Sequence, residues 1–274
     1  MQKTAKILTT LLLTATAQAE QFISLNLCSD RLLLELAEPH QIAAQSVYSN
    51  NPKMMLDKLN LDKPRLKPEL PALLPYADKT ILVNTLFYPE LAERLTQFGF
   101  KVVPLNDNPQ TAEELFALIL QLGELTQNQA KAEALVAKLR LQKIPEKRPL
   151  ADTVILSETG LAEMHQPQYQ TLLALLGLEP VKIPLPERNF SLEKLIQSQP
   201  HQLIQLTDNQ SYNAQAEWLH HPTLQKIFVN RPLVSLPMKY TYCFDHGVWQ
   251  GAELIKNKLS VGAGFNPPEK DNID

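Results

Sequence analysis

Short apolar runs and amphipathic segments alternate along the first part of the chain. Residues 22–25, 41–46, 79–83 and 101–105 are apolar runs of strand length, and segments 31–37 and 89–98 have the apolar spacing of helices. Pro89 begins the second of these helices and Gly99 follows its end, which are the positions that proline and glycine favour. Strands that alternate with helices predict a parallel sheet covered by helices.

The pattern changes at residue 111. Apolar positions recur at helical spacing from Leu115 to Leu139, and Thr111 with Glu114 has the sequence of a capping box. We predict one continuous helix over residues 111–141, about 45 Å long at about 1.5 Å per residue. Such a helix is longer than one small domain needs.

A second alternating half follows this helix. We predict strands at 153–156, 203–206 and 233–236 and helices at 168–176, 191–197, 214–220, 223–227 and 247–259. The predicted fold class is therefore α/β: two lobes with parallel-rich sheets flanked by helices, joined by one long backbone helix, with a cleft between the lobes. The predicted boundaries are an N-terminal lobe at 20–110, the connecting helix at 111–141, a C-terminal lobe at 142–260 and a disordered tail at 261–274.

The first residues have the layout of an export signal. Lys3 and Lys6 precede an apolar core at 7–13, and Ala17 and Ala19 form a small-x-small cleavage site. The apolar core is shorter than the about 20 residues that span a bilayer. We predict a signal peptide at 1–19 and a periplasmic mature protein; an N-terminal amphipathic helix is the alternative.

The net charge of the predicted mature chain narrows the classes of binding partner. Without Lys3 and Lys6, 24 basic and 29 acidic side chains remain, a net charge of −5. This balance offers no electrostatic surface for nucleic acid or an anionic membrane. With no second apolar stretch of membrane length, we expect a soluble mature protein.

The sequence has two cysteines, Cys28 and Cys243. In an oxidising compartment an isolated pair often forms a disulfide. A lipid anchor on Cys28 is a poor alternative, because Leu27 is too large for the preceding position, and a buried thiol is the other. Both cysteines fall in loops expected to face the cleft from opposite lobes, so we predict a Cys28–Cys243 disulfide, which by loop entropy contributes about 4–5 kcal/mol.

The loops after the predicted strands hold the candidate binding residues, because ligands in such folds lie outside the carboxyl ends of the strands. An aromatic-rich cleft favours a large, flat or partly apolar ligand, although each ring could instead pack its own loop. The candidate ligand-binding residues are Asn26, Cys28, Tyr48, Phe87, Tyr88, His165, Tyr212, Tyr240, Tyr242, Phe244 and His246.

Signatures of catalysis are largely missing. The sequence contains no G-x-S-x-G elbow, no P-loop and no G-x-G-x-x-G motif. Glu158 and Glu163 are paired carboxylates only by their proximity in sequence. His165 and His246 could ligate a metal in the cleft, or could simply form hydrogen bonds. We predict no bound cofactor and no zinc site.

Two segments carry recognisable motifs: Ser24-Leu-Asn-Leu-Cys-Ser-Asp30 has the form S-L-N-x-C-x-D, and Phe190-Ser-Leu-Glu-Lys-Leu195 contains S-L-E-x-L. The first is similar to the opening of a subgroup, and the second resembles a segment, of one family: the periplasmic iron-complex and vitamin B12 binding proteins that serve ABC importers. The resemblance extends over residues 22–259. It implies a monomeric receptor, not an enzyme, that delivers a corrinoid, a ferric siderophore or haem to permease and ATPase subunits, with an outer-membrane receptor system upstream.

The resemblance also implies docking residues. One glutamate on each lobe of these receptors contacts permease arginines. Glu193 matches the second-lobe position directly, whereas the first-lobe position falls at Pro89, with Glu90 beside it and Glu93 one turn further on. A simple helix-dipole role is the alternative, since acids near a helix start are favoured in any case.

The chain departs from the family pattern at two places. His201 replaces an aspartate, and Phe244-Asp-His246 stands where relatives have Gly-Gly-Pro. The second change could reshape the pocket. Two rival functions remain open: a periplasmic hydrolase or chelatase using Glu158, His165 and His246, and an adaptor that has lost its ligand.

Overall fold

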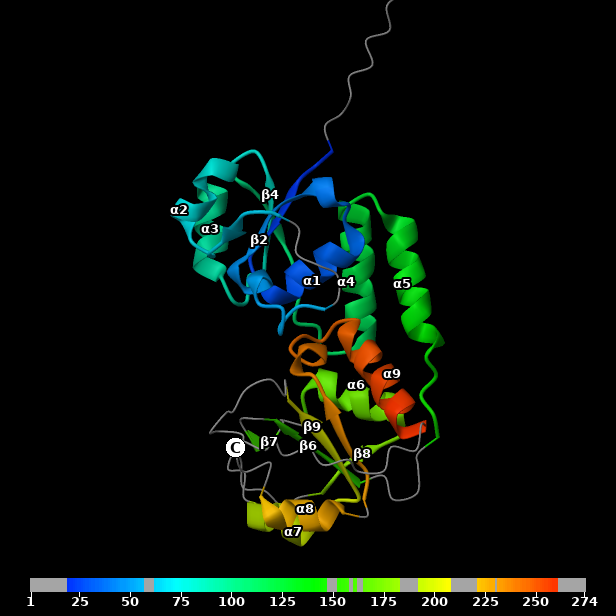
Figure 1. Ribbon diagram of the computed structural model, residues 1–274. Coiled ribbons are helices and arrows are strands. Elements are labelled where there is room, and N and C mark those ends of the chain that lie inside the picture. Colours follow the sequence, from blue (N-terminus) through cyan, green and yellow to red (C-terminus); the bar gives the residue numbers. More distant parts are fainter. Residues whose placement is uncertain are drawn as a thin grey trace, which may run out of the picture.

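A computed structural model describes residues 19–56, 62–146, 152–157, 160–161, 165–182, 192–207, 221–229 and 231–260. The predicted signal peptide up to residue 18, the helix at 214–220 and the tail at 261–274 lie outside these residues. So do Glu158, Glu163 and Tyr212. The described chain forms two α/β lobes, one above the other in Figure 1, which confirms the predicted fold class apart from its long helix.

The N-terminal lobe is built on a five-stranded sheet in the order β3-β2-β1-β4-β5. Every strand pair in it is parallel. The strands are β1 (Phe22–Ser24), β2 (Ile42–Ser46), β3 (Arg65–Leu66), β4 (Thr80–Val83) and β5 (Lys101–Pro104). Its helices are α1 (Leu27–Leu36), η1 (Pro39–Gln41), η2 (Val47–Asn50), α2 (Leu70–Leu73), η3 (Leu74–Tyr76) and α3 (Pro89–Gln97).

Side chains along the central strands β1, β2 and β4 point alternately to the two faces of the sheet, and they are buried on both faces. On β4, Ile81 and Val83 pack with α2 and α3, while Leu82 joins the cluster that holds Leu33 of α1 and helix α4. Helix α1 begins earlier than its predicted start at residue 31. Asn26 caps it by accepting a hydrogen bond from the Ser29 N–H at 3.0 Å.

The C-terminal lobe has a second sheet in the order β10-β9-β6-β7, with β8 also paired to β6. Its strands are β6 (Asp152–Ser157), β7 (Gly160–Leu161), β8 (Glu179–Pro180), β9 (Gln202–Leu206) and β10 (Leu233–Leu236). The helices are α6 (Pro167–Leu176), α7 (Leu192–Ser198), α8 (Pro222–Phe228), η5 (Met238–Tyr240) and α9 (Gly247–Ser260). All pairs except β6–β7 are parallel.

The prediction of one continuous helix over 111–141 is wrong. The segment forms two helices, α4 (Ala112–Leu125) and α5 (Gln129–Leu141), which lie side by side in Figure 1. The chain reverses at Gln127, whose φ of 57° is left-handed. Gly123 permits the close approach of α5, since a Cβ there would lie 2.4 Å from the Cβ of Ala132.

Tertiary hydrogen bonds hold this reversal. Gln41 donates from Nε2 to the Thr126 carbonyl oxygen at 2.7 Å and accepts from the Asn128 amide at 3.0 Å. The turn is therefore fastened to the N-terminal lobe. Consequently α5, at about 1.5 Å per residue, runs for only about 20 Å before the chain continues to the second lobe.

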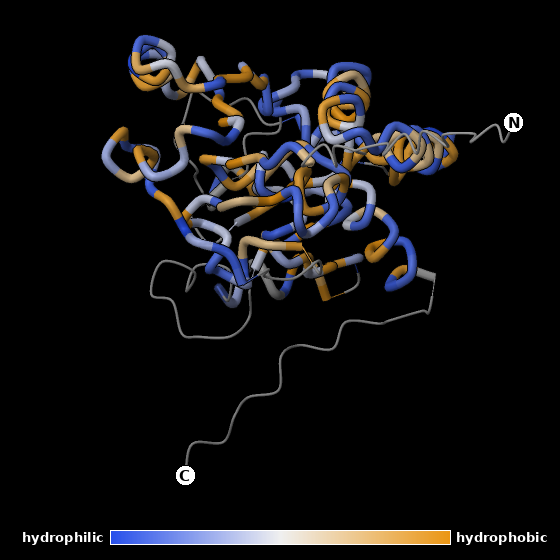
Figure 2. The backbone as a smooth tube through the Cα atoms, turned by 90° about the horizontal axis from the view of Figure 1, so that it is seen from above, coloured by the Kyte–Doolittle hydropathy of each residue, from blue (hydrophilic) through white to orange (hydrophobic). Residues whose placement is uncertain are grey.

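One hydrophobic cluster is continuous across both lobes. It joins Leu33 of α1 and Ile119 of α4 to side chains of the second lobe, among them Leu172 of α6, Ile204 of β9 and Val248 of α9. In Figure 1, α6 and α9 lie at the boundary between the lobes. Figure 2 shows hydrophobic and hydrophilic residues mixed along the outer helices, as expected for helices with one buried face.

Candidate functional site

The candidate site lies at the carboxyl edge of the first sheet. Tyr48 follows β2 and Phe87 and Tyr88 follow β4, and because these strands are parallel their ends meet at one edge. Tyr48 is 43% exposed and Phe87 57% exposed. Burial raises the pKa of the Tyr88 phenol, and the neighbouring Tyr48 and Asp107 raise it further. These aromatic side chains form an open wall, which we call the aromatic wall.

The loop that carries Phe87 has a fixed backbone. The side-chain oxygen of Asn84 accepts hydrogen bonds from the N–H groups of Leu86, at 2.9 Å, and Phe87, at 3.1 Å. The Asn84 carbonyl oxygen accepts two more, from Phe87 at 3.2 Å and Tyr88 at 2.9 Å. Leu86 and Phe87 are thus held out to solvent by a rigid turn rather than by a loose loop.

The second lobe approaches this edge through the segment after β10. Tyr240 is half-buried in η5, and Tyr242 is 37% exposed. The Lys239 ammonium lies 5.3 Å from the centroid of the Tyr240 ring. This placement adds partly exposed aromatic surface from the C-terminal lobe next to the residues that join the lobes.

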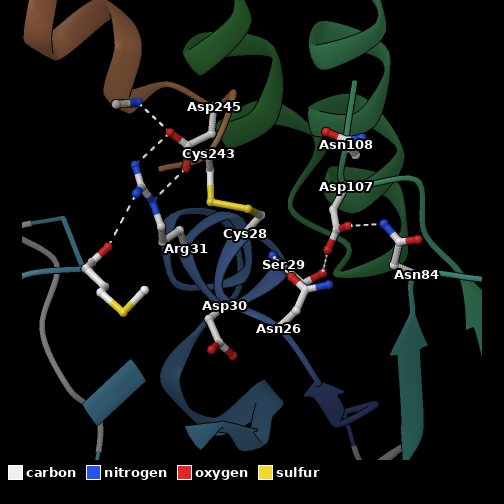
Figure 3. The surroundings of a disulfide bond; sticks show 12 residues. Asn26, Cys28, Ser29, Asp30, Arg31, Asn84, Asp107, Asn108, Cys243 and Asp245 are labelled. Carbon is white, nitrogen blue, oxygen red and sulfur yellow. Dashed lines mark hydrogen bonds and ion pairs between the residues drawn. A yellow bond between two sulfur atoms is a disulfide. The ribbon is translucent and has the colours of Figure 1, made fainter. Parts of the chain in front are cut away.

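A disulfide joins the lobes, as predicted. Cys28 in the first turn of α1 is bonded to Cys243, with a Cα–Cα distance of 5.6 Å (Figure 3). That distance lies within the ordinary range for disulfides. Cys243 is buried and Cys28 half-buried. The crosslink therefore fixes the segment after β10 against the start of α1.

A buried ion pair lies beside the disulfide. Arg31 Nε is 2.7 Å from Asp245 Oδ2, and its Nη2 donates to Asp245 Oδ1 at 2.8 Å (Figure 3). Nη1 also donates to the Lys239 carbonyl oxygen at 2.7 Å. Gly247 makes room for the guanidinium, since a Cβ at that position would lie 2.4 Å from Arg31 Nη2. This bidentate pair between lobes is shielded from water, which would otherwise weaken it.

A second carboxylate is buried inside the first lobe. Asp30 accepts hydrogen bonds from the hydroxyls of Ser24 and Ser46 and from the Ser46 N–H at 3.0 Å. Burial raises the pKa of Asp30 to about 7, and these hydrogen bonds only partly offset that rise. Asp30 therefore binds the ends of β1 and β2 to α1, and its charge changes near neutral pH.

The structure gives Phe244 and His246 internal positions. The Phe244 ring stacks on Trp249 with centroids 6.0 Å apart and an interplanar angle of 15°. His246 is 4% exposed and its Nε2 lies 3.8 Å from Glu35 Oε2. The unusual Phe244-Asp-His246 segment thus supplies core packing and the ion pair with Arg31, and we leave Phe244 and His246 out of the proposed binding surface.

The other predicted ligand residues are spread more widely. Asn26 is half-buried at the start of α1, where its side chain already accepts the capping bond, and Cys28 is held in the disulfide. His165 is exposed just before α6. Among the described residues there is no group of three or more His, Cys, Asp and Glu side chains that could hold a metal ion.

The predicted docking glutamates are exposed at helix starts. Glu90 is in the first turn of α3 and Glu193 in the first turn of α7. Glu93, one turn further along α3, lines a shallow groove of about 360 Å³ between α3 and β5. No described helix is long and apolar enough to cross a membrane.

Sequence reasoning missed the buried polar residues Asn84, Asp107, Arg31 and Asp245. A usable signal existed for two of them: Asn84 directly follows β4 and Asp107 closely follows β5, at the sheet edge where polar side chains gather. Arg31 and Asp245 offered no local signal, because their pairing joins positions that are distant in the sequence.

Solved structures share the fold over nearly the whole chain. The periplasmic heme-binding protein HutB of Vibrio cholerae has a TM-score of 0.68 and 20% identity, covering 88% of this chain and 99% of its own. The siderophore-binding protein FhuD of Vibrio cholerae, bound to Fe³⁺-Desferal, has a TM-score of 0.64 and 18% identity, covering 88% and 98%. The vitamin B12 binding protein BtuF of Vibrio cholerae has a TM-score of 0.58 and 14% identity, covering 89% and 98%.

No protein-family model matches the sequence, and no curated protein matches it significantly. The structural similarity nevertheless defines the fold. This chain has the two-lobe architecture of periplasmic solute-binding proteins.

Proposed function

We propose that this protein is a periplasmic receptor that binds a bulky metal complex and delivers it to an ABC importer of the inner membrane. The observation that carries the proposal is the aromatic wall, placed at the carboxyl edge of the first sheet in a fold shared with heme, siderophore and vitamin B12 binding proteins. Stacking and surface burial on such side chains suit a large ligand with a flat or apolar face. The export signal and the disulfide support a periplasmic location.

The ligand class is a corrinoid, a ferric siderophore or haem. Because His246 is buried beside Glu35, the proposal assigns recognition to stacking on Tyr48, Phe87, Tyr88 and Tyr242 rather than to an axial histidine. The rival hydrolase or chelatase would use Glu158, His165 and His246; of these, His246 is buried beside Glu35, and Glu158 lies outside the described residues. We also disfavour an adaptor that has lost its ligand. Exposed aromatic side chains gathered at one edge of a sheet are typical of a surface that binds a ligand or partner.

A spectroscopic titration tests the ligand class. The mature protein is titrated with hemin, vitamin B12 and the ferric complex of Desferal, and we expect micromolar or tighter binding of one of them. Phe87→Ala should raise the Kd of that ligand about tenfold or more, equivalent to about 1.4 kcal/mol. Phe98→Ala is the matched control, because Phe98 is similarly exposed, at 62%, but ends α3 away from the wall. Absence of binding to all three probes would overturn the proposal.

We also propose that Glu193 and Glu90 or Glu93 contact basic residues of the permease. Charge reversal with Glu193→Lys, or with Glu90→Lys, should lower the apparent affinity for the importer at least tenfold while ligand affinity stays unchanged, because like charges would then face each other. The readout is ligand-stimulated ATPase activity of the reconstituted importer. Glu133→Lys, on the exposed side of α5, is the control for net charge. Equal losses in all variants would contradict docking at these positions.

A further inference from the structure

The loop at residues 85–88 combines two properties that seldom occur together. Leu86 is 72% exposed and Phe87 57% exposed, yet the loop backbone is fixed from below by the Asn84 side chain, which is 1% exposed. Asn84 Oδ1 accepts from both the Leu86 and Phe87 N–H groups. Removing this acceptor would take from the Leu86 N–H its side-chain partner and leave the Phe87 N–H only its longer bond to the Asn84 carbonyl oxygen, at 3.2 Å.

The NH₂ group of the Asn84 side chain is also hydrogen-bonded. Asn84 Nδ2 donates to Asp107 Oδ1, and the second oxygen, Asp107 Oδ2, accepts from the Ser29 hydroxyl (Figure 3). Asp107 is 4% exposed and Ser29 1% exposed, so water competes little for these bonds. Ser29 belongs to α1 and directly follows Cys28, which carries the crosslink to the second lobe.

This arrangement determines which way the Asn84 amide points. An ionised carboxylate can only accept hydrogen bonds, so Asp107 requires the NH₂ end of Asn84 to face it. The Asn84 oxygen is then left to face the loop, where it accepts both N–H groups. Without Asp107 the Asn84 side-chain amide could rotate by half a turn, and its NH₂ group would then face the Leu86 and Phe87 N–H groups, which are also donors. The exposed loop thus depends on the carboxylate of Asp107 through the orientation of the Asn84 amide.

We propose that Asn84 is a positioning residue for the ligand-contacting loop, oriented by Asp107 and Ser29. The ligand part of this inference rests on the proposed function. Holding Leu86, Phe87 and Tyr88 in place before a ligand arrives removes the entropy loss of ordering the loop on binding. The hydrogen bonds that link Ser29, Asp107 and Asn84 therefore affect affinity although none of these side chains belongs to the aromatic wall.

An exchange of the two side chains separates positioning from general stability. Asn84→Asp keeps an acceptor for the loop but loses the donor and sets a carboxylate against Asp107. In the double variant Asn84→Asp/Asp107→Asn the amide and the carboxylate are interchanged. The amide at position 107 can donate to the carboxylate at position 84 and still accept from the Ser29 hydroxyl, while the carboxylate at position 84 accepts from the loop N–H groups. Asn108→Asp is the control, since it adds the same charge at an exposed neighbour of Asp107.

The first measurement is hydrogen exchange of the Leu86 and Phe87 amides at pH 8 without ligand, compared with amides of α1. We expect exchange at least tenfold faster in Asn84→Asp, return toward the wild-type rate in the double variant and no change in Asn108→Asp. Wild-type exchange at Leu86 and Phe87 in a folded Asn84→Asp protein would overturn the inference, as would failure of the double variant to restore slow exchange.

The second measurement is binding of hemin, vitamin B12 and ferric Desferal, well below the melting temperature of each variant. For the probe that binds, the Kd should rise at least fivefold in Asn84→Asp and recover in the double variant. Fast loop exchange with an unchanged Kd would overturn the role in binding. If the wild-type protein binds no probe, the proposed function falls, while the exchange rates still decide whether Asn84 holds the loop.

Discussion

Asp30 is a buried acid whose charge state changes close to neutral pH. Its carboxylate accepts hydrogen bonds from Ser24 and Ser46, and burial raises its pKa to about 7, well above the ordinary value of 3.8. Between these two values the folded protein retains a proton that the unfolded chain releases. The stabilising contribution of protonated Asp30 is therefore complete below about pH 4, declines as the pH rises toward 7 and is constant above that.

Asp30→Asn should remove this dependence. An amide can satisfy the serines without ionising, so the stability of wild type relative to the variant should fall between pH 4.5 and pH 7.5, by about 3 kcal/mol at about 1.4 kcal/mol per pKa unit. Urea unfolding at several pH values measures the difference. Asp62→Asn, at an exposed carboxylate, should show no comparable trend. Parallel pH curves for wild type and Asp30→Asn would contradict the assignment.

The role of a single residue could be predicted from the sequence where one chemical property of that residue determines its role. Two cysteines leave a single possible intramolecular disulfide, and Cys28–Cys243 is confirmed. Of the aromatic residues expected in loops after strands, Phe87 and Tyr242 lie in loops, whereas Tyr48 and Tyr240 lie in the short helices η2 and η5. The sequence could not say which of these side chains turn inward. Phe244 and His246 are buried because the segment after Cys243 packs on Trp249 and pairs with Arg31, and both contacts depend on the assembled fold.

At the scale of helices and strands, the hairpin α4–α5 shows that local sequence does not reveal a turn that is determined by distant contacts. The seven longer strands followed from their apolar runs, namely β1, β2, β4, β5, β6, β9 and β10. The two-residue strands β3, β7 and β8 did not, because they are too short to carry a pattern. The break at residues 126–128 did not follow, because Gln127 is a good helix former and the apolar spacing continues past it. Contacts distant in sequence, from Gln41 to Thr126 and Asn128, decide the reversal.

Gly123→Ala should destabilise the hairpin. Alanine favours a helix over glycine by about 1 kcal/mol, but the new Cβ would lie 2.4 Å from the Cβ of Ala132. Overpacking of this kind costs about 1–3 kcal/mol, so we expect a net loss in the free energy of unfolding. Ala132→Gly in the same chain should restore part of that loss, as measured by thermal or urea unfolding. A stabilised Gly123→Ala protein would show that the helices separate freely.

At the scale of the whole molecule, the contacts that hold the lobes together in the described part of the chain include the shared hydrophobic cluster, the Arg31–Asp245 pair and the disulfide. The continuous core indicates that the lobes unfold as one unit. The disulfide contributes mainly by restricting the unfolded chain, since it closes a loop between residues 215 positions apart.

Cys28→Ser/Cys243→Ser should therefore lower the free energy of unfolding by about 5 kcal/mol without parting the lobes. The expected urea curve has an earlier midpoint and a single transition, and the radius of gyration in solution stays that of the wild type. Each single Cys→Ser variant serves as a control that lacks the crosslink but keeps one thiol. Two separate transitions in the double variant would show that the crosslink, rather than the core and the ion pair, unites the lobes.

If the chain is exported N-terminus first, as we propose, the disulfide also sets an order of events. Cys28 reaches the oxidising side 215 residues ahead of Cys243, and the sequence offers no third cysteine as an interim partner. During that interval the Cys28 thiol can pair only with another molecule, such as a thiol oxidant or a second nascent chain. The crosslink therefore forms late in export, and its yield should depend on how fast the C-terminal part of the chain is delivered.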